Sequence, residues 1–250
     1  MMAARGLREM TGIAVALLWA VAVGGGAQAA PAATAASPVA AYRGDGHDPL
    51  AARLAASAPA LARAVLDDAL RARACAIASG DRIAAQALRL AVIDYALPST
   101  QVRLWLFDLA SGRLLLAEHV AHGRGSGEDM ATAFSNDDGS HQSSLGLYHG
   151  AEPYVGGNGY SLRLDGLEPG INHRARERLI VIHGAPYVDP AQALRQGRLG
   201  RSWGCPVVRP AVAREVIDAL KDGQLVFVHG ADADWRARSR LLDCPAVKRR

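Results

Sequence analysis

One stretch of the chain, residues 179–209, constrains the fold more than any other part of the sequence. It opens with the apolar run LIVI, which is typical of a buried strand and ends at His183. It closes with Cys205, set among the small residues of SWGC. One fold-back of the chain would bring the histidine and the cysteine together. A base that takes the proton from a thiol is the minimum for nucleophilic chemistry at sulfur, so the pair predicts a thiolate site.

The residues between the histidine and the cysteine predict a short helix with defined ends. Asp189 is a good helix N-cap, Pro190 suits the first helical position, and Gly197 suits the residue just past the helix end. The predicted order is therefore strand, histidine, short helix, loop and cysteine. The histidine precedes the cysteine by 22 positions (205 minus 183), whereas papain-like enzymes place the cysteine well before the histidine.

Short apolar segments separated by glycine-rich turns predict mostly β-structure for the rest of the chain. Residues 88–95 are mostly apolar, and residues 101–121 contain two strand-like segments around a Ser-Gly turn, the first with the period-two alternation of a half-buried strand. A helix is predicted over residues 210–222, from a proline to a glycine. The pattern indicates an α+β protein, mostly β. Further strands are predicted at 145–149, 160–164, 178–183 and 224–229.

The two motifs around the histidine and the cysteine resemble those of a known family. HG at 183–184 and SWGC at 202–205 are similar to the HG and SxGC motifs of the L,D-transpeptidase catalytic domain, the YkuD-type fold. The longer strings ERLIVIHGAPYV and RSWGCP resemble its murein L,D-transpeptidase catalytic domain branch. The likeness extends upstream through VAHGRGSGEDMATAFSN, SSLGLY and GYSLRLDGLEPGIN, and it covers roughly residues 85–230. It implies the β-rich L,D-transpeptidase fold, here with an N-terminal helical extension.

The resemblance implies acyl transfer through a thioester on Cys205, with His183 as the base. In the family, the carbonyl of the residue after the histidine, here Gly184, orients the imidazole. The developing oxyanion needs N–H donors. The backbone amides of Trp203, Gly204 and Cys205 are the candidates, because a glycine just before the nucleophile lets the chain present them together. No cofactor is needed for this chemistry.

The sequence departs from the most widespread family pattern at two positions near the nucleophile. That pattern has histidine where this chain has Trp203, and arginine two residues after the cysteine, where this chain has Val207. Neither change touches the nucleophile or the base, but both affect the expected substrate contacts. Trp203 is expected either to stack on the peptide stem or to form a wall of the pocket.

Four further residues are candidates for substrate binding. Arg201 and Arg209 are candidates for a substrate carboxylate, with a surface role as the alternative. Ser202 is either a donor-site hydroxyl or a turn residue. His122 begins the loop AHGRGSGED, which the resemblance places in the catalytic domain, and a position in the cleft is expected. There is no HExxH motif and no cysteine pair at zinc spacing, so no metal site is expected.

Residues 1–29 have the features of a secretory signal peptide. Arg5 and Arg8 form a positive first region, residues 13–23 form an apolar segment, and Ala27-Gln28-Ala29 is a cleavage site of the A-x-A type. The apolar segment is too short to span a bilayer. The sequence therefore predicts an exported protein, periplasmic or secreted, without a stable membrane span after cleavage. An uncleaved membrane anchor is the alternative.

The expected mature chain has four parts. Residues 30–47 are an Ala/Pro-rich leader, 48–84 a helical extension, 85–235 the catalytic domain and 236–250 a C-terminal tail. Three cysteines are an odd number for an exported protein, so Cys75 and Cys244 either form a disulfide or stay free. The formal net charge of +4 is mild and spread along the chain, so it does not imply a nucleic-acid partner.

The expected function is that of an exported peptidoglycan L,D-transpeptidase, which crosslinks stem peptides through an acyl-enzyme on Cys205. If water resolves the thioester instead, the same residues would make an L,D-carboxypeptidase or endopeptidase. A sortase-like enzyme also runs histidine before cysteine, but its cysteine motif differs. A non-catalytic cell-wall-binding protein is the alternative from another class. The sequence does not specify the acyl acceptor or the oligomeric state.

Overall fold

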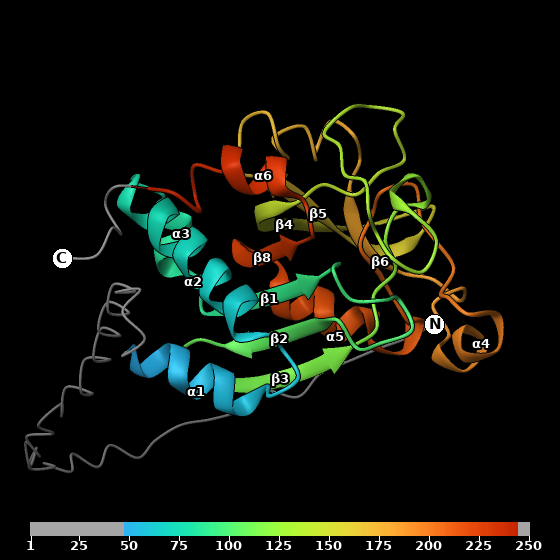
Figure 1. The fold of residues 1–250 in the computed structure, drawn as a ribbon, viewed down its shortest axis with the longest axis horizontal. Coiled ribbons are helices and arrows are strands. Elements are labelled where there is room, and N and C mark those ends of the chain that lie inside the picture. Colours follow the sequence, from blue (N-terminus) through green and yellow to red (C-terminus); the bar gives the residue numbers. More distant parts are fainter. Residues whose placement is uncertain (1–47, 245–250) are drawn as a thin grey trace, which may run out of the picture. The chain divides into compact units, whose positions relative to one another are not determined.

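A mixed sheet of eight strands forms the centre of the protein. The computed structural model describes residues 48–244, so the predicted signal peptide and leader lie outside the described residues. The strands lie in the order β3-β2-β1-β8-β4-β5-β6-β7 (Figure 1). This confirms the predicted α+β, mostly β, class. The strands are β1 (Arg89–Asp94), β2 (Leu104–Asp108), β3 (Arg113–Glu118), β4 (Gly146–Gly156), β5 (Gly159–Gly166), β6 (Val181–Gly184), β7 (Val207–Val208) and β8 (Gln224–His229).

Most neighbouring strands are antiparallel, and two pairs are parallel. The predicted hairpin over residues 101–121 is confirmed as the β2–β3 pair, in which Leu106 lies opposite Leu116. β1 runs parallel to β8, and β6 runs parallel to β7. In the second of these pairs, His183 lies opposite Val207. This register places the histidine near the segment that carries the cysteine.

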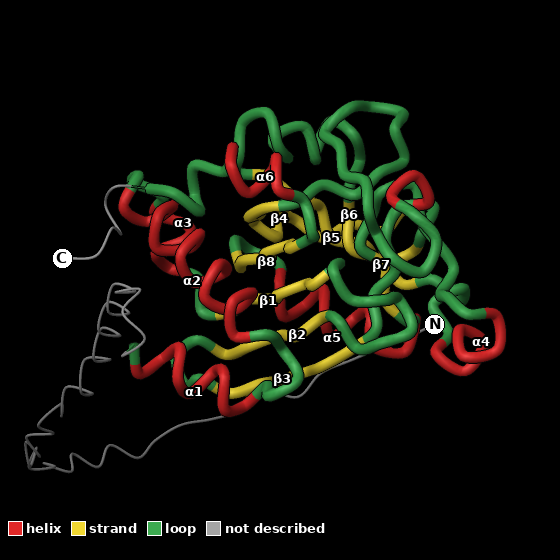
Figure 2. Tube along the Cα trace, in the orientation of Figure 1, coloured by secondary structure: helices red, strands yellow, loops and turns green. Residues whose placement is uncertain are grey.

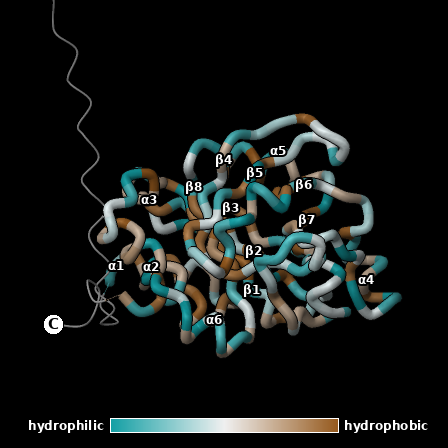
Figure 3. Tube along the Cα trace, turned by 90° about the horizontal axis from the view of Figure 1, so that it is seen from above, coloured by the Kyte–Doolittle hydropathy of each residue, from teal (hydrophilic) through white to brown (hydrophobic). Residues whose placement is uncertain are grey.

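The prediction that the 101–107 segment is half-buried is wrong. Arg103, Trp105 and Phe107, on the face expected to meet solvent, are all buried, and so are Leu104 and Leu106 on the other face. Helices cover both faces of the sheet: α2 (Arg63–Ala78) packs on β1, β4 and β8, and α5 (Pro210–Leu220) packs on β1, β4, β5, β6 and β8. Figures 1 and 3 show these helices on opposite sides of the strands, with apolar chain between them.

The N-terminal helices share the hydrophobic core of the sheet. Leu54 of α1 (Pro49–Ser57) and Leu66 of α2 are buried in the same cluster as the strand residues. Asp48 caps α1 by accepting hydrogen bonds from two backbone amides. A short third helix, α3 (Arg82–Gln86), leads into β1. Within residues 48–244, no helix is both long and apolar enough to cross a lipid bilayer.

A disulfide between Cys75 and Cys244 ties the C-terminal segment to α2, as one of the two sequence alternatives held. Two further contacts fasten the same segment. Arg236 of α6 (Ala233–Arg238) pairs with Asp68 of α2, and Ser239 donates a hydrogen bond to the buried Glu168. The tail is therefore part of the folded body as far as residue 244.

The local predictions between the histidine and the cysteine are confirmed. α4 (Pro190–Gln196) begins after Asp189, whose side chain accepts from the amides of residues 191 and 192, and it ends at Gly197 with a φ of 79°. The predicted strand at 178–183 begins later, at residue 181, because Leu179 has a φ of 56° and ends a helical turn. Loops gather around β6 and β7 at this edge of the sheet (Figure 2).

Candidate active site

A cavity of about 610 Å³ lies at the β6–β7 edge and contains both members of the predicted pair. This volume falls in the range of small-molecule and peptide sites. Arg201, Ser202, Trp203 and Cys205 line it from the loop before β7. The other lining residues come from the tip of the β4–β5 hairpin and from β6 and the loop after it: Gly157, Asn158, His183, Gly184, Ala185, Pro186 and Tyr187.

The backbone just before β6 holds the Cys205 sulfur. The amide of Val181 donates to Sγ at 3.5 Å, and Sγ donates to the carbonyl of Leu179 at 3.7 Å. Burial raises the pKa of the Cys205 thiol, while the Val181 amide and the positive charge of Arg178 act in the opposite direction. Cys205 is the one cysteine outside the disulfide. At neutral pH the resting form is therefore the thiol.

The ring of His183 is oriented by its own backbone neighbour. Nδ1 lies 3.2 Å from the carbonyl oxygen of Gly184, the contact that the family resemblance predicts. A carbonyl can only accept, so we assign the proton to Nδ1, which leaves Nε2 with a free lone pair. Burial lowers the pKa of His183, so the imidazole is neutral at pH 7. A neutral imidazole is the form that can remove a proton from a thiol.

Gly184 is required for a reason that the sequence did not suggest. A tight backbone turn is not the reason, because Gly184 is not among the glycines with positive φ in the described chain. Instead, a Cβ at this position would lie 2.8 Å from the Cβ of Ala213 and 3.1 Å from the Cα of Pro210. Glycine lets the first turn of α5 approach the strand that carries His183.

Ser202 closes the loop before the cysteine and engages one of the three expected oxyanion donors. The Ser202 hydroxyl donates to the Cys205 carbonyl at 2.7 Å and accepts from the Gly204 amide at 3.1 Å. The Gly204 amide is therefore engaged inside the loop and is not open to an oxyanion while this bond is made. The Trp203 amide has no acceptor among residues 48–244. Gly204 itself has a φ of 122°, a conformation that favours glycine.

A second loop, residues 122–124, packs against the loop before Cys205, which we call the cysteine loop (residues 197–205). The Ser202 amide donates to the carbonyl of His122 at 2.9 Å, and the Arg124 amide donates to the carbonyl of Ser202 at 2.7 Å. Between them, a Cβ on Gly123 would lie 2.7 Å from the Cα of Gly204. The backbones touch here, so only glycine fits without a shift.

Ser143 fastens the two loops together. Its hydroxyl accepts from the Gly123 amide at 3.0 Å and donates to the Gly204 carbonyl at 2.9 Å. Sequence reasoning assigned no role to Gly123 or Ser143. The available signal was that both fall within strings that carry the family resemblance, VAHGRGSGED and SSLGLY.

Trp203 forms an aromatic platform at the cavity. Its side chain is 69% exposed, yet it is held in place by stacking on His141, with ring centroids 5.0 Å apart. Arg124 lies over the indole at 5.4 Å, and its guanidinium also donates to Nδ1 of His141. This geometry fits the expected wall or stacking surface of the pocket, with one indole face available to a ligand.

Two of the predicted substrate-binding residues lie elsewhere. His122 is fully buried, and its Nδ1 lies 2.8 Å from the guanidinium of Arg103. Burial and the charge of Arg103 lower the pKa of His122 to about 4. Arg209 pairs with Glu118 and lines a separate groove on the far side of Pro186. The expected cleft position of His122 is therefore wrong, and Arg209 has the surface position that was its alternative.

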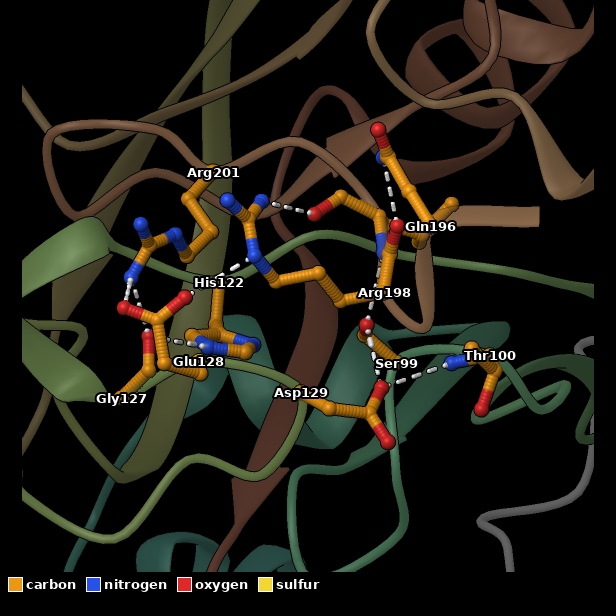
Figure 4. Close-up of polar contacts among 10 residues, drawn as sticks. Ser99, Thr100, His122, Gly127, Glu128, Asp129, Gln196, Arg198 and Arg201 are labelled. Atoms are coloured by element: carbon orange, nitrogen blue, oxygen red, sulfur yellow. Dashed lines mark hydrogen bonds and ion pairs between the residues drawn. The ribbon is translucent and has the colours of Figure 1, made fainter. Parts of the chain in front are cut away.

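Arg201 and Ser202 do line the cavity, but both are already engaged. Nη1 of Arg201 donates to the carbonyl of Gly127 at 2.8 Å and to Glu128 at 2.7 Å. Glu128 also pairs with Arg198, and Figure 4 shows both arginines directed toward this carboxylate. Arg201 thus anchors the 127–129 loop to the cysteine loop, and its remaining guanidinium N–H groups are left for a ligand.

The described residues contain no group of three or more histidine, cysteine or acidic side chains placed to hold a metal ion. The donor atoms of the cavity suit a different chemistry. A thiol, a neutral imidazole and an unengaged backbone amide are arranged around one space, and together they can attack a carbonyl and hold the resulting charge.

Comparison with known proteins identifies the family of this chain. The family model of the L,D-transpeptidase catalytic domain matches residues 57–229. The chain therefore belongs to the L,D-transpeptidase catalytic domain family. The matched range includes β6, β7 and the loops at residues 122–124 and 197–205, and it begins at the end of α1. The comparison with curated proteins gave no match.

Solved structures similar to this chain include several L,D-transpeptidases. The enzyme from Mycobacterium smegmatis is 14% identical, with a TM-score of 0.35, and the match covers 57% of this chain and 59% of that one. The Enterococcus faecium L,D-transpeptidase is 15% identical, with a TM-score of 0.34, and the match covers 56% of this chain and 48% of that one. The helical cell shape determining protein Pgp2 from Campylobacter jejuni is 13% identical, with a TM-score of 0.37, and the match covers 62% of this chain and 52% of that one. The chain thus spans less than two thirds of each of these proteins.

Proposed function

We propose that this protein is an exported peptidoglycan L,D-transpeptidase that acts through a thioester on Cys205. The observation that carries the proposal is the shared cavity of Cys205 and His183, with the imidazole oriented by the Gly184 carbonyl. Family membership supports the class of reaction. A peptide carbonyl placed in the cavity would meet both the sulfur and the base.

The first half of the reaction forms the acyl-enzyme. Nε2 of His183 takes the thiol proton as Sγ of Cys205 bonds to the carbonyl carbon of the donor stem, and the carbonyl electrons move to oxygen. The C–N bond then breaks, and the leaving amine takes the proton from His183. The neutral resting states of both groups suit this sequence, because the thiol still has its proton and the imidazole has a free lone pair.

The negative charge on oxygen needs N–H donors while the tetrahedral intermediate exists. We propose the backbone amides of Trp203 and Cys205 for this role, since the Gly204 amide is bonded to Ser202. Removing one oxyanion donor typically costs about 3–4 kcal/mol of transition-state stabilisation. The Ser202 bridge would fix the direction of both amides by closing the loop.

The second half transfers the acyl group. An amine from a neighbouring stem attacks the thioester carbon and passes its proton to His183. The C–S bond then breaks, and the sulfur takes the proton from His183 to leave as the thiol. The new amide bond is the crosslink. Attack by water would give the L,D-carboxypeptidase or endopeptidase outcome instead. Trp203 and Arg201, which line the cavity, are the proposed contacts with the peptide stems. No cofactor takes part.

Product analysis tests the proposal. The mature protein and a Cys205→Ala variant are each incubated with a disaccharide-tetrapeptide, and the products are separated by mass. We expect crosslinked dimer from the wild type and none from the variant. Tripeptide without dimer would replace the transferase by a hydrolase. Untouched substrate with the wild type, in the presence of an added amine acceptor, would contradict the proposal.

The proposed location and domain organisation can be tested on the same protein. Residues 1–29 would be removed on export, which leaves a mature chain that begins at Ala30. Intact mass of the secreted or periplasmic protein would identify the new N-terminus. A full-length mass in a membrane fraction would favour the uncleaved anchor. We retain the proposed boundaries of the leader, extension, catalytic domain and tail as 30–47, 48–84, 85–235 and 236–250.

A further inference from the structure

We propose that Arg178 is a positioning residue for the Cys205 sulfur. It holds residues 135–144, the loop that packs against the loop before Cys205, and its guanidinium supplies a fixed positive charge to the sulfur. The inference rests on the proposed function, and it concerns a residue outside the cavity lining. It explains how a thiol among apolar and neutral groups is made reactive without an imidazolium beside it.

Arg178 makes four hydrogen bonds to a single loop. Nη1 donates to the carbonyl of Ser135 at 2.8 Å and to the hydroxyl of Ser144 at 2.6 Å. Nη2 donates to the hydroxyl of Ser140 at 3.1 Å and to the carbonyl of Gln142 at 2.8 Å. The guanidinium therefore gathers residues 135–144 around itself. Each of the four acceptors is electrically neutral.

Two other arginines in the same stretch are neutralised, while Arg178 is not. Arg174 pairs with Glu177, and Arg176 pairs with Asp165 and Glu152. Arg178 forms no direct ion pair with any residue in the described part of the chain, although it is half-buried, and the carboxylates of Asp137 and Asp138 act on it without contact. A partly desolvated charge without a directly bonded counter-charge is costly. Such a cost is understandable where a negative charge develops during the reaction.

Two short paths connect Arg178 to the nucleophile. The next residue, Leu179, has a left-handed φ of 56°, and its carbonyl receives the Cys205 thiol. On the other side, the Gln142 carbonyl that Arg178 binds lies against Gly204, where an added Cβ would be only 2.9 Å away. The guanidinium thus supports both walls of the sulfur site.

The other ionisable groups around the sulfur are neutral, paired with a carboxylate or bonded elsewhere. His183 is neutral, and burial raises the pKa values of Tyr95 and Tyr187, so both remain protonated phenols. Arg201 is paired with Glu128, and Arg124 lies over the Trp203 ring with its guanidinium bonded to His141. Arg178 is therefore the cation outside any ion pair whose contacts reach both walls of the sulfur site.

The reactivity of Cys205 toward iodoacetamide as a function of pH tests the inference without any stem peptide. The other two cysteines are in the disulfide, so alkylation reports on Cys205 alone. We expect Arg178→Gln to shift the alkylation profile to higher pH and to lower the rate at pH 7 by about tenfold, the effect of one pKa unit. Arg178→Lys keeps the charge and should lie near the wild type.

A matched pair at Ser140 tests the charge in a protein that keeps Arg178. Ser140→Asp places a carboxylate beside Nη2 and should shift the profile in the same direction as Arg178→Gln. Ser140→Asn, of similar size and neutral, should not. Arg174→Gln, on the same turn but paired at the surface, is the second control. This pair decides the question even if Arg178→Gln does not fold.

An unshifted profile in Ser140→Asp, or equal shifts in Ser140→Asp and Ser140→Asn, would overturn the inference. So would a folded Arg178→Gln variant with the alkylation profile of the wild type. These outcomes are distinct from failure of the proposed function. If the wild type left stem peptides untouched, the alkylation shifts would still decide whether Arg178 acts on Cys205.

Discussion

The two ends of the sheet are stabilised in different ways. At the helical end, defined by α1, α2 and the strands β1–β3, leucines pack into one core, and the disulfide fastens the tail to α2. At the catalytic edge, defined by β6, β7 and residues 121–144 and 197–205, hydrogen bonds join the loops.

The backbone shows the same difference. Of the non-glycine residues with positive φ in the described chain, His141 (55°) lies at the catalytic edge and Leu179 (56°) just before β6. Asp222 (60°) lies between α5 and β8, and none lies at the helical end. Unfavourable backbone conformations tend to occur at functional sites, where the surrounding structure holds them. The hydrophobic core runs through the whole sheet, and the chemistry is located where polar contacts hold a strained chain at its edge.

The disulfide provides the largest test of this division. Replacing Cys75 and Cys244 by serine should lower the free energy of unfolding by about 4 kcal/mol, because the bridge closes a long loop in the unfolded chain. Denaturant unfolding measures this loss. The alkylation rate of Cys205 in the folded variant should stay at the wild-type value. A large change in that rate would mean that the two ends are not separate.

Acid should weaken the catalytic edge through His122. Its pKa is about 4 in the folded protein, below the ordinary value of 6.5, so the unfolded chain takes up the proton first as the pH falls. The stabilising contribution is complete above pH 6.5 and is lost between pH 6.5 and about 4. The total loss is on the order of 3 kcal/mol.

Unfolding free energies measured across this pH window check the prediction. His122→Gln, which removes the titrating group, should flatten the dependence between pH 6.5 and 4. An equally steep dependence in the variant would assign the acid sensitivity to other groups.

Gly123→Ala should damage the catalytic edge more than the fold. The new Cβ would lie 2.7 Å from the Cα of Gly204, and overpacking of this kind typically costs about 1–3 kcal/mol. The new Cβ would lie still closer to the carbonyl oxygen of His141, so the displacement is shared between the cysteine loop and the loop that carries His141. Because the cysteine loop is one of the two, the acylation rate should fall by about a hundredfold, the size of a lost oxyanion donor. Gly157→Ala is the control for the free energy of unfolding alone, because a Cβ there meets nothing within 4 Å, although the residue lines the cavity. Equal effects of the two substitutions on the free energy of unfolding would contradict the proposed contact.

Trp203→Ala should have the smallest effect, confined to substrate binding. Loss of the aromatic platform should raise KM by about tenfold with little change in kcat, the pattern expected for uniform binding. Leu194→Ala is the matched control, since Leu194 is 78% exposed on α4 and does not line the cavity. A fall in kcat at unchanged KM would instead give Trp203 a role in the chemical step.

Local signals explain which parts of this structure could be predicted. The strand before His183, the Asp189 cap and the Gly197 stop depend on neighbouring residues, so their outcome could be derived from sequence. The late start of β6, at residue 181, could not be predicted, because the left-handed conformation of Leu179 has no sequence signature.

Long-range contacts explain what was missed. Gly123 and Ser143 matter because they touch Gly204, far away in the sequence, and no spacing rule links them. The buried outer face of β2 depends on helices that cover the sheet, and the burial of His122 depends on Arg103. Periodicity describes one strand, whereas these positions are decided by the elements packed against it.

The intact mass of the protein during reaction with a stem tetrapeptide tests directly whether Cys205 carries the acyl group. We expect the wild type to gain the mass of the tripeptide less one water. The adduct should be absent from Cys205→Ala and strongly reduced in His183→Gln, while both variants keep the wild-type melting temperature. An adduct that persists in Cys205→Ala would mean that another residue carries the acyl group, and the proposed role of Cys205 would be wrong.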